Sequence, residues 1–147
     1  MGPSNFTIEI AERKSQSPLL LFCSRLLSAD NDALYNREFL CEQGLRSAVA
    51  KGYVIIAIAD GVICGMLRFY PNRRKEQISV YQFAVSEANR GQGVVDAMLR
   101  FLCKHYNGAI VCKCPKSSAF NGYFNKTGWK IISECDPYYY WEWRLLS

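Results

Sequence analysis

The spacing of apolar residues in the first half of the chain predicts a strand, two helices and a β-hairpin. Residues 6–13 begin with alternating apolar and polar side chains, which is typical of a strand. Ser17 and Pro18 then predict a helix start, because serine caps the first turn and proline is tolerated at its first position. The β-branched run at 53–59 predicts a strand, and the Asp-Gly pair after it is typical of a tight turn into a returning strand.

The second half of the chain continues the pattern with further strands and helices, separated by glycine and proline. The helix predicted between the strands over 77–85 and 109–114 implies that these two strands run parallel. In chain order, the predicted elements are a strand over 6–13, helices over 17–27 and 33–50, strands over 53–59, 62–70 and 77–85, a helix over 91–106, a strand over 109–114, a helix from Ser117 or Ser118 to Lys126, and strands over 129–134 and 138–146.

This order (strand, two helices, antiparallel meander, helix, strand, helix, hairpin) predicts an α/β fold of the α+β type with a mixed sheet. A chain of 147 residues suits one domain, which we place over residues 5–147. Residues 1–4 are interpreted as an expression scar or a disordered N-terminus. No apolar run reaches the length of a membrane span, and the N-terminus lacks a signal-peptide pattern, so no membrane partner is expected.

The most specific feature is the turn between the strand over 77–85 and the helix that follows it. Gly91 and Gly93 lie in this turn, and without a Cβ atom their backbone can approach a ligand closely. The first turn of a helix also presents unpaired N–H groups at the positive end of its dipole. Together these features predict a phosphate site, with Arg90 adding positive charge. A tight connection without a ligand is the alternative interpretation.

Two common phosphate-binding motifs are excluded by the spacing. A P-loop requires a glycine, four intervening residues and then a Gly-Lys-Ser/Thr string, and the chain has no such string. A dinucleotide fingerprint requires a third glycine where Asp96 lies, and an acidic residue about twenty positions further on, where the next strand carries none.

The remaining pattern, Arg-x-x-Gly-x-small, resembles the GCN5-related N-acetyltransferase (GNAT) superfamily, whose turn holds the pyrophosphate of acetyl-coenzyme A. The order of elements resembles that superfamily as well. The resemblance implies an acyl-CoA N-acyltransferase-like fold and acetyl-CoA as the acyl donor, with no metal. Val95 departs from the family's usual Gly or Ala, and its bulkier side chain could crowd the helix against the strand or the cofactor. Its backbone N–H remains, so we expect binding to survive. The residues that the resemblance assigns to the cofactor are Phe83, Ala84, Val85, Arg90, Gly91, Gln92, Gly93, Val94, Val95 and Phe124.

Residues 117–129 resemble a second element of the superfamily, which ends in Gly-Phe and carries a tyrosine that protonates the leaving thiolate. Gly128-Trp129 matches the ending, but Phe124 stands at the tyrosine position. Tyr123 lies one residue earlier, about 100° around a helix, and is the candidate catalytic acid. An aromatic packing role for Tyr123 is the alternative interpretation.

The strand before the glycine turn also lacks the glutamate that serves some family members as a base. Ser79, Tyr81 and Gln82 occupy its central positions. The resemblance therefore implies a direct attack by the amine, with proximity supplying much of the rate and water accepting the proton.

The acceptor site of such folds is walled by the loop between the first two helices and by the last hairpin loop. These segments carry four carboxylates that we predict to bind the acceptor: Asp30, Asp32, Glu134 and Asp136. A carboxylate-lined mouth favours a cationic amine, such as a small-molecule amine, a lysine or a peptide N-terminus. Ordinary turn and capping roles are the alternative for each residue.

Cysteine usage and charge indicate the cellular compartment and the kind of ligand. The seven cysteines lack the paired spacing of a zinc site and are predicted to be free thiols, mostly buried, in a reducing compartment, which indicates the cytoplasm. Residues 68–130 carry eleven basic and three acidic side chains, a net charge of +8, which would attract an anionic cofactor. A nucleic-acid surface is the less favoured reading of the same charge.

Three hypotheses follow for the function. The first is an acetyl-CoA-dependent N-acetyltransferase that acts on a small-molecule or protein amine, as a monomer or a homodimer. The second is a CoA-binding module with impaired catalysis, suggested by Phe124 and the missing glutamate. The third and least favoured is a basic, nucleic-acid-associated protein.

Overall fold

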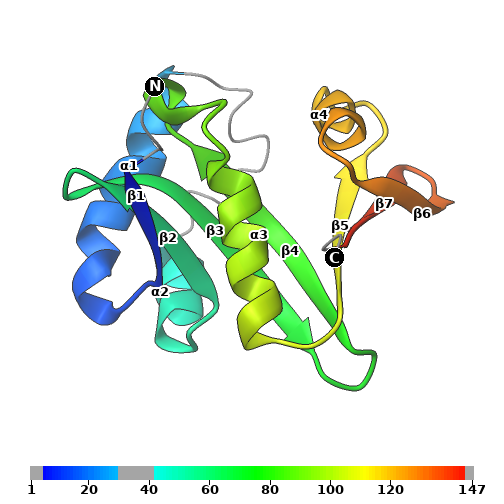
Figure 1. Cartoon of the computed structure of the whole chain (residues 1–147), viewed down its shortest axis with the longest axis horizontal. Coiled ribbons are helices and arrows are strands. Elements are labelled where there is room, and N and C mark those ends of the chain that lie inside the picture. The colour runs from blue at the N-terminus through cyan, green and yellow to red at the C-terminus, as the bar shows by residue number, and fades with distance from the viewer. Residues whose placement is uncertain (1–4, 30–41, 145–147) are drawn as a thin grey trace. The chain divides into compact units, whose positions relative to one another are not determined.

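The structure is a computed structural model that describes residues 5–29 and 42–144. Within these residues, seven strands form one sheet in the order β1-β2-β3-β4-β5-β7-β6 (Figure 1). The elements are β1 (Phe6–Ile10), η1 (Arg13–Ser15), α1 (Gln16–Ala29), α2 (Glu42–Ala50), β2 (Val54–Ala59), β3 (Val62–Asn72), β4 (Gln77–Val85), η3 (Glu87–Asn89), α3 (Val94–His105), β5 (Ala109–Pro115), α4 (Phe120–Lys126), β6 (Lys130–Cys135) and β7 (Tyr138–Trp143). The predicted α/β class and mixed sheet are confirmed.

The chain folds into two compact units. The first unit comprises Met1–Arg68 and Gln82–Phe101, and the second comprises Phe69–Tyr81 and Leu102–Ser147. β3, β4 and α3 each contribute residues to both units. The assignment of residues 5–147 to a single domain stays a prediction.

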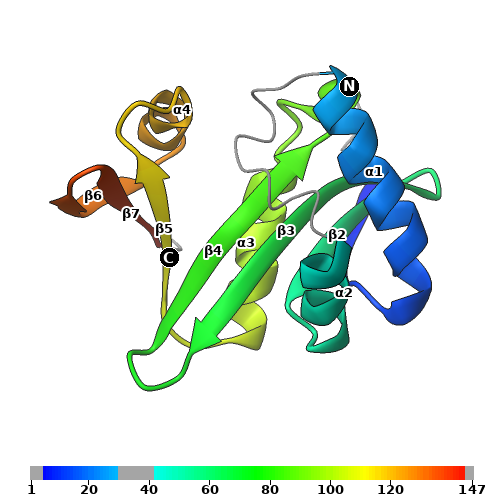
Figure 2. The ribbon, with the colours of Figure 1, turned by 180° about the vertical axis from the view of Figure 1, so that it is seen from behind.

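In the first unit, α1 and α2 cover one face of the sheet and α3 lies on the opposite face (Figures 1 and 2). β1 pairs with β2 and β2 pairs with β3, both antiparallel. Apolar residues three and four positions apart on the helices pack against alternate residues of the strands. The cluster on this face is formed by Ala11, Leu19, Phe22, Cys23, Leu26, Leu45, Ala48, Val49, Val54, Ile56, Met66 and Ala84.

In the second unit, β5 joins a parallel and an antiparallel neighbour. β4 and β5 pair in parallel from Gln77↔Ala109 to Val80↔Cys112, which confirms the predicted direction. β5 then pairs with β7, and β7 with β6, both antiparallel. Phe124 of α4 is buried in this unit, stacked on Trp141 with ring centroids 5.5 Å apart.

Several predicted boundaries differ from the structure: the strand predicted over 6–13 ends at Ile10, and the helix predicted from Ser117 or Ser118 begins at Phe120. α3 begins at Val94 and not at residue 91, because the glycines before it have left-handed backbone angles that cannot continue a right-handed helix. α1 begins at Gln16 after a 3-10 turn, so Ser17 lies inside the helix and does not cap it. β3 extends to Asn72, two residues beyond the predicted end at residue 70, so the turn into β4 occupies residues 73–76. Of the helix predicted over 33–50, residues 33–41 lie outside the described residues, and α2 is described from Glu42.

Candidate active site

The turn between β4 and α3 is held by hydrogen bonds within itself and to β3. The Ser86 N–H donates to Cys64 O at 2.8 Å, which joins the end of β4 to β3. The Ser86 hydroxyl donates to Asn89 Oδ1 at 2.7 Å, and the Asn89 N–H donates to Ser86 O at 2.9 Å. These bonds close a compact bend around η3, which leads the chain from the strand to the start of the helix.

Two glycines in the left-handed region carry the chain from this bend into α3. Gly91 has φ +77° and Gly93 has φ +80°, values that cost other residues about 1–2 kcal/mol. A Cβ atom on either glycine would have no heavy atom within 4 Å, so backbone conformation and not space selects glycine here. The Ala97 N–H donates to Gly93 O at 3.0 Å and is the first N–H bonded within the helix, so the N–H groups of residues 93–96 precede the first helical donor. These groups form a donor set suited to an anion.

The charged and amide side chains around this turn are bonded to its backbone or to each other. Arg90 Nε donates to Val85 O at 3.2 Å, which keeps the guanidinium at the carboxyl end of β4. Gln92 Nε2 donates to Ala88 O at 3.4 Å. Asp96, the acidic residue in the first turn of α3, pairs with Arg100 at 2.7 Å. Its negative charge beside the turn is therefore balanced within the helix.

A close approach between β3 and α3 positions this turn, and it was not predicted from the sequence. A Cβ atom on Gly65 would lie 2.9 Å from Val94 Cγ1 and 3.4 Å from Ala57 Cβ and Ala84 O. Gly65 therefore lets the first residue of α3 pack directly on the sheet, where Val94 is buried. Val94 is the residue at this close approach, whereas Val95 is half-buried, and crowding by Val95 stays a prediction. A glycine inside a strand is the signal that was available for this contact.

We predict that Gly65→Ala destabilises the protein by about 1–3 kcal/mol, because the added methyl group overpacks against a stiff β-branched side chain. Chemical denaturation measures this change. Gly65→Ala combined with Val94→Ala should recover part of the loss, since the second substitution reopens the space. Additive losses in the double variant would contradict the proposed contact.

The strand end that the sequence analysis assigned to the cofactor lies next to the turn in the first unit. Phe83, Ala84 and Val85 are the last residues of β4. The parallel ladder with β5 ends earlier, at Val80, and β4 continues for five further residues. The structure thus brings the predicted residues 83–85 and 90–95 together in one unit.

Tyr123 and Phe124 lie in the second unit, on α4. Phe124 is 1% exposed and has Trp129 edge-on at 5.0 Å and Trp141 stacked on it. Tyr123 is half-buried and meets the Phe124 ring edge-on at 5.9 Å. The phenylalanine at the family's tyrosine position is therefore a core residue of this unit, and its contact with the cofactor stays a prediction.

The predicted acceptor carboxylates of the last hairpin are bound to a lysine. Lys116 Nζ lies 2.8 Å from Glu134 Oε2 and also pairs with Asp136. Hydrogen bonds to Asp136 and then Glu134 raise the pKa of Lys116, and the hydrogen bond from Lys116 lowers the pKa of Asp136. The charge of this cluster is thus −1, and not the −2 of two unpaired carboxylates. Asp30 and Asp32 lie outside the described residues.

A family model for the acetyltransferase (GNAT) family matches residues 19–119, which is more than half of the chain. The chain belongs to the GNAT family. The matched range includes α1 from residue 19 onward, the sheet from β2 to β5 and the glycine turn before α3. The resemblance stated from the sequence is therefore confirmed, and the turn over residues 86–93 is called the GNAT turn below.

Solved structures of GNAT proteins share this fold at low sequence identity. An acetyltransferase of the GNAT family from Listeria monocytogenes is 13% identical, with a TM-score of 0.76 over 95% of each chain. The PaiA N-acetyltransferase of Thermoplasma acidophilum, solved with coenzyme A, is 10% identical, with a TM-score of 0.75 over 94% of this chain and 98% of that one. N-acetylglutamate synthase of Neisseria gonorrhoeae, complexed with coenzyme A and N-acetyl-glutamate, is 14% identical with a TM-score of 0.71, and the match covers 99% of this chain and 36% of that one. No curated protein sequence matches the chain.

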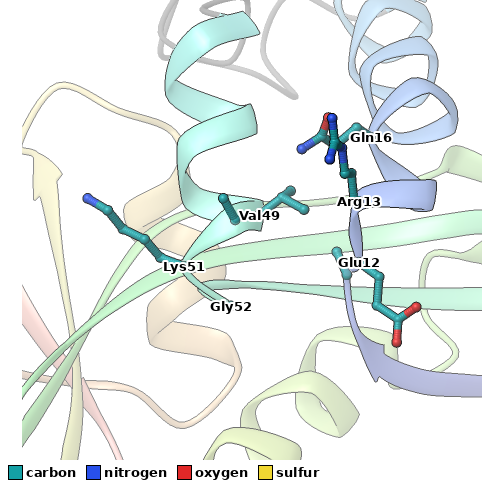
Figure 3. A pocket seen from close by; sticks show the side chains of 8 residues that line it. Glu12, Arg13, Gln16, Val49, Lys51 and Gly52 are labelled. Atoms are coloured by element: carbon teal, nitrogen blue, oxygen red, sulfur yellow. The ribbon is translucent and has the colours of Figure 1, made fainter.

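A surface hollow of about 630 Å³ lies in the first unit of this GNAT protein and involves none of the predicted site residues (Figure 3). One side of the hollow is formed by the segment after β1, which includes Arg13, and by Gln16 of α1. The other side is formed by the end of α2 and by Lys51, which follows α2. Arg46 Nη1 donates to Gln16 Oε1 at 2.7 Å and ties the two helices together beside it.

The cysteines of the described residues are free, as predicted, and most are buried. Burial raises the pKa of the Cys23 thiol to about 11 and that of Cys112 to about 12, so both stay protonated at neutral pH. Cys135 is exposed, and Cys41 lies outside the described residues. In the same part of the chain, no group of three or more His, Cys, Asp or Glu is arranged to hold a metal ion. None of the described helices is long and apolar enough to cross a membrane.

Proposed function

We propose that this GNAT protein is an N-acetyltransferase that moves an acetyl group from acetyl-CoA to a primary amine, by direct transfer in a ternary complex. One observation carries the proposal: left-handed Gly91 and Gly93 set the first N–H groups of α3 beside Arg90 at the end of β4. Such a donor set favours a phosphate group. PaiA and N-acetylglutamate synthase were both crystallised with coenzyme A, and these complexes support acetyl-CoA as the acyl donor of the present protein.

In this proposal the GNAT turn and the first residues of α3 bind the pyrophosphate of acetyl-CoA through their main chain. The N–H groups of residues 91–95 provide hydrogen bonds, and the Arg90 guanidinium provides charge. The pantetheine arm then follows the strand end at 83–85, where a backbone N–H group hydrogen-bonds the thioester oxygen. Such donors are fixed before the reaction, so they stabilise a developing oxyanion without reorganisation.

The reaction itself needs few side chains. The lone pair of the neutral amine attacks the thioester carbonyl carbon, the C–N bond forms, and the carbonyl oxygen becomes an oxyanion. The C–S bond then breaks, the amine proton passes to water, and coenzyme A leaves as a thiolate that is protonated. An amine with a pKa near 10 is mostly protonated at neutral pH, so the rate should rise with pH until the amine is neutral.

A decisive experiment follows thiol release from acetyl-CoA with a panel of amines and measures coenzyme A binding by calorimetry. Binding together with amine-dependent thiol release supports the enzyme. Binding without turnover for any amine would favour the alternative, a CoA-binding module, which is suggested by the burial of Phe124 and the absence of a glutamate at the centre of β4. Absence of binding would reject both.

Tyr123 is proposed as the acid that protonates the leaving thiolate. We predict that Tyr123→Phe lowers kcat by about 10- to 100-fold with little change in KM for acetyl-CoA, because only the hydroxyl is removed. Tyr138→Phe in the second unit serves as the control. An unchanged kcat would show that Tyr123 is a packing residue and that solvent protonates the thiolate.

The acceptor is proposed to bind near Glu134 and Asp136, as well as Asp30 and Asp32. Because Lys116 already pairs with the first two, their attraction for a cation is weaker than two unpaired carboxylates would give. Removing Lys116 would test this role, since an acceptor bound by these carboxylates should then bind more tightly.

A further inference from the structure

Gln82 is a buried polar residue whose side chain has no hydrogen-bond partner among the described residues. It lies near the centre of β4 and is 3% exposed. Both Oε1 and Nε2 are enclosed and unpartnered. Buried amides are almost always paired, because an amide without a partner loses its bonds to water and gains nothing in return. Such an exception calls for a physical reason.

The side chain of Gln82 lies on the face of the sheet that α1 and α2 cover. Burial alternates along β4, so Gln82 shares its face with Ala84, and Ala84 belongs to the core cluster of those two helices. Arg68 of β3 lies two residues from Met66 of the same cluster and therefore shares this face. Arg68 and Gln82 are the buried polar residues of the described chain, and they lie on one otherwise apolar face.

The position of Gln82 places its amide close to the proposed chemistry. It directly precedes residues 83–85, whose backbone is proposed to hold the thioester. Two residues of a strand span about 7 Å, so an amine bound to Gln82 lies within reach of the carbonyl carbon of the thioester. An amide is not a base, but it offers one acceptor oxygen and one donor nitrogen, and it can therefore orient an attacking amine.

We propose that Gln82 is an acceptor-binding residue, and that it selects amines carrying a carbonyl or carboxylate oxygen beside the amino group. This inference rests on the proposed acetyltransferase function. Oε1 accepts an N–H of the amine and Nε2 donates to the neighbouring oxygen, so one small ligand group satisfies both atoms. An alkyl polyamine offers only nitrogen donors and would leave Nε2 unpaired.

The test compares Gln82→Met, a substitution of similar shape without polar atoms, with wild type and with Ser79→Ala at an exposed position of β4. Because the amide has no partner in the protein alone, Gln82→Met should leave the melting temperature equal or higher. It should lower kcat/KM for an α-amino acid or a dipeptide by about 10- to 100-fold, since hydrogen bonds to the amine and its neighbouring oxygen are lost. The rate with an alkyl diamine should fall less, because only the hydrogen bond to Oε1 is lost, and the coenzyme A affinity should not change.

Two outcomes would overturn the inference while leaving the proposed function intact. One is a lower melting temperature for Gln82→Met, which would mean that the amide is paired within the fold. The other is an equal loss of kcat/KM for every amine, or no loss of kcat/KM for any of them. A binding readout decides the matter even for a protein without turnover: in the presence of coenzyme A, an α-amino acid should raise the melting temperature of wild type but not of Gln82→Met. Failure of coenzyme A itself to bind wild type would instead reject the proposed function.

Discussion

Gly93→Ala is expected to weaken coenzyme A binding by about 10- to 100-fold. The substitution adds a Cβ to a residue with φ +80°, and its methyl group would meet no neighbouring atom. The effect therefore comes from the backbone: an alanine relaxes toward negative φ at a gain of about 1–2 kcal/mol, and this rotates the N–H groups at the start of α3 away from the ligand. Isothermal titration calorimetry with coenzyme A measures the loss directly.

Gly61→Ala is the matched control for this prediction. Gly61 has φ +76° in the β2–β3 turn, and a Cβ there would also meet nothing within 4 Å. Both variants should therefore lose a similar amount of stability, while only Gly93→Ala loses affinity. Equal coenzyme A affinity in the two variants would show that the phosphate does not bind at the GNAT turn.

Asn121→Ala is expected to be the most destabilising of the substitutions considered, by about 2–4 kcal/mol. Asn121 Nδ2 donates to Pro115 O at 2.8 Å, to Ser118 O at 2.9 Å and to Lys116 O at 3.2 Å. Its Oδ1 accepts the Trp141 Nε1–H at 3.0 Å. One side chain thus pairs with three carbonyl oxygens of the loop between β5 and α4 and with the indole N–H of a tryptophan that is 4% exposed.

The loss in Asn121→Ala combines broken hydrogen bonds with an indole N–H left buried and unpaired. We expect the melting temperature to fall by roughly 10 °C, measured by calorimetry or circular dichroism. Asn125→Ala, at an exposed position of the same helix, should change it little. Similar melting temperatures for the two variants would mean that this network contributes no net stability.

The local features of the candidate site could be predicted from the sequence. The positions of Gly91, Gly93 and Arg90 indicated an anion-binding turn. The left-handed backbone angles of glycines before a helix depend on neighbouring residues in the chain, so a short segment of sequence is enough to indicate them. The predicted helix start was three residues early, since an apolar stripe alone does not reveal where the backbone leaves the left-handed region. The GNAT family followed from the same few residues and the order of elements.

The partners of individual side chains could not be predicted in this way. Glu134 and Asp136 were expected to face the acceptor, and the structure pairs both with Lys116, about twenty residues away in the chain. Gln82 was noted only as a residue that is not a glutamate, because its burial depends on helices that lie far from it in sequence. Tyr123 stays a prediction, with its ring packed on the edge of Phe124.

The sequence by itself determined the family, the mixed α/β architecture and the location of the glycine turn, since these depend on periodicity and on backbone angles that nearby residues impose. Only the tertiary structure decided that Gly65 admits Val94 to the sheet, that Asn121 holds Trp141 and that Gln82 is buried without a partner. Each of these facts concerns atoms brought together by strand pairing and helix packing across many residues, and contacts of that kind leave no periodic pattern in the chain.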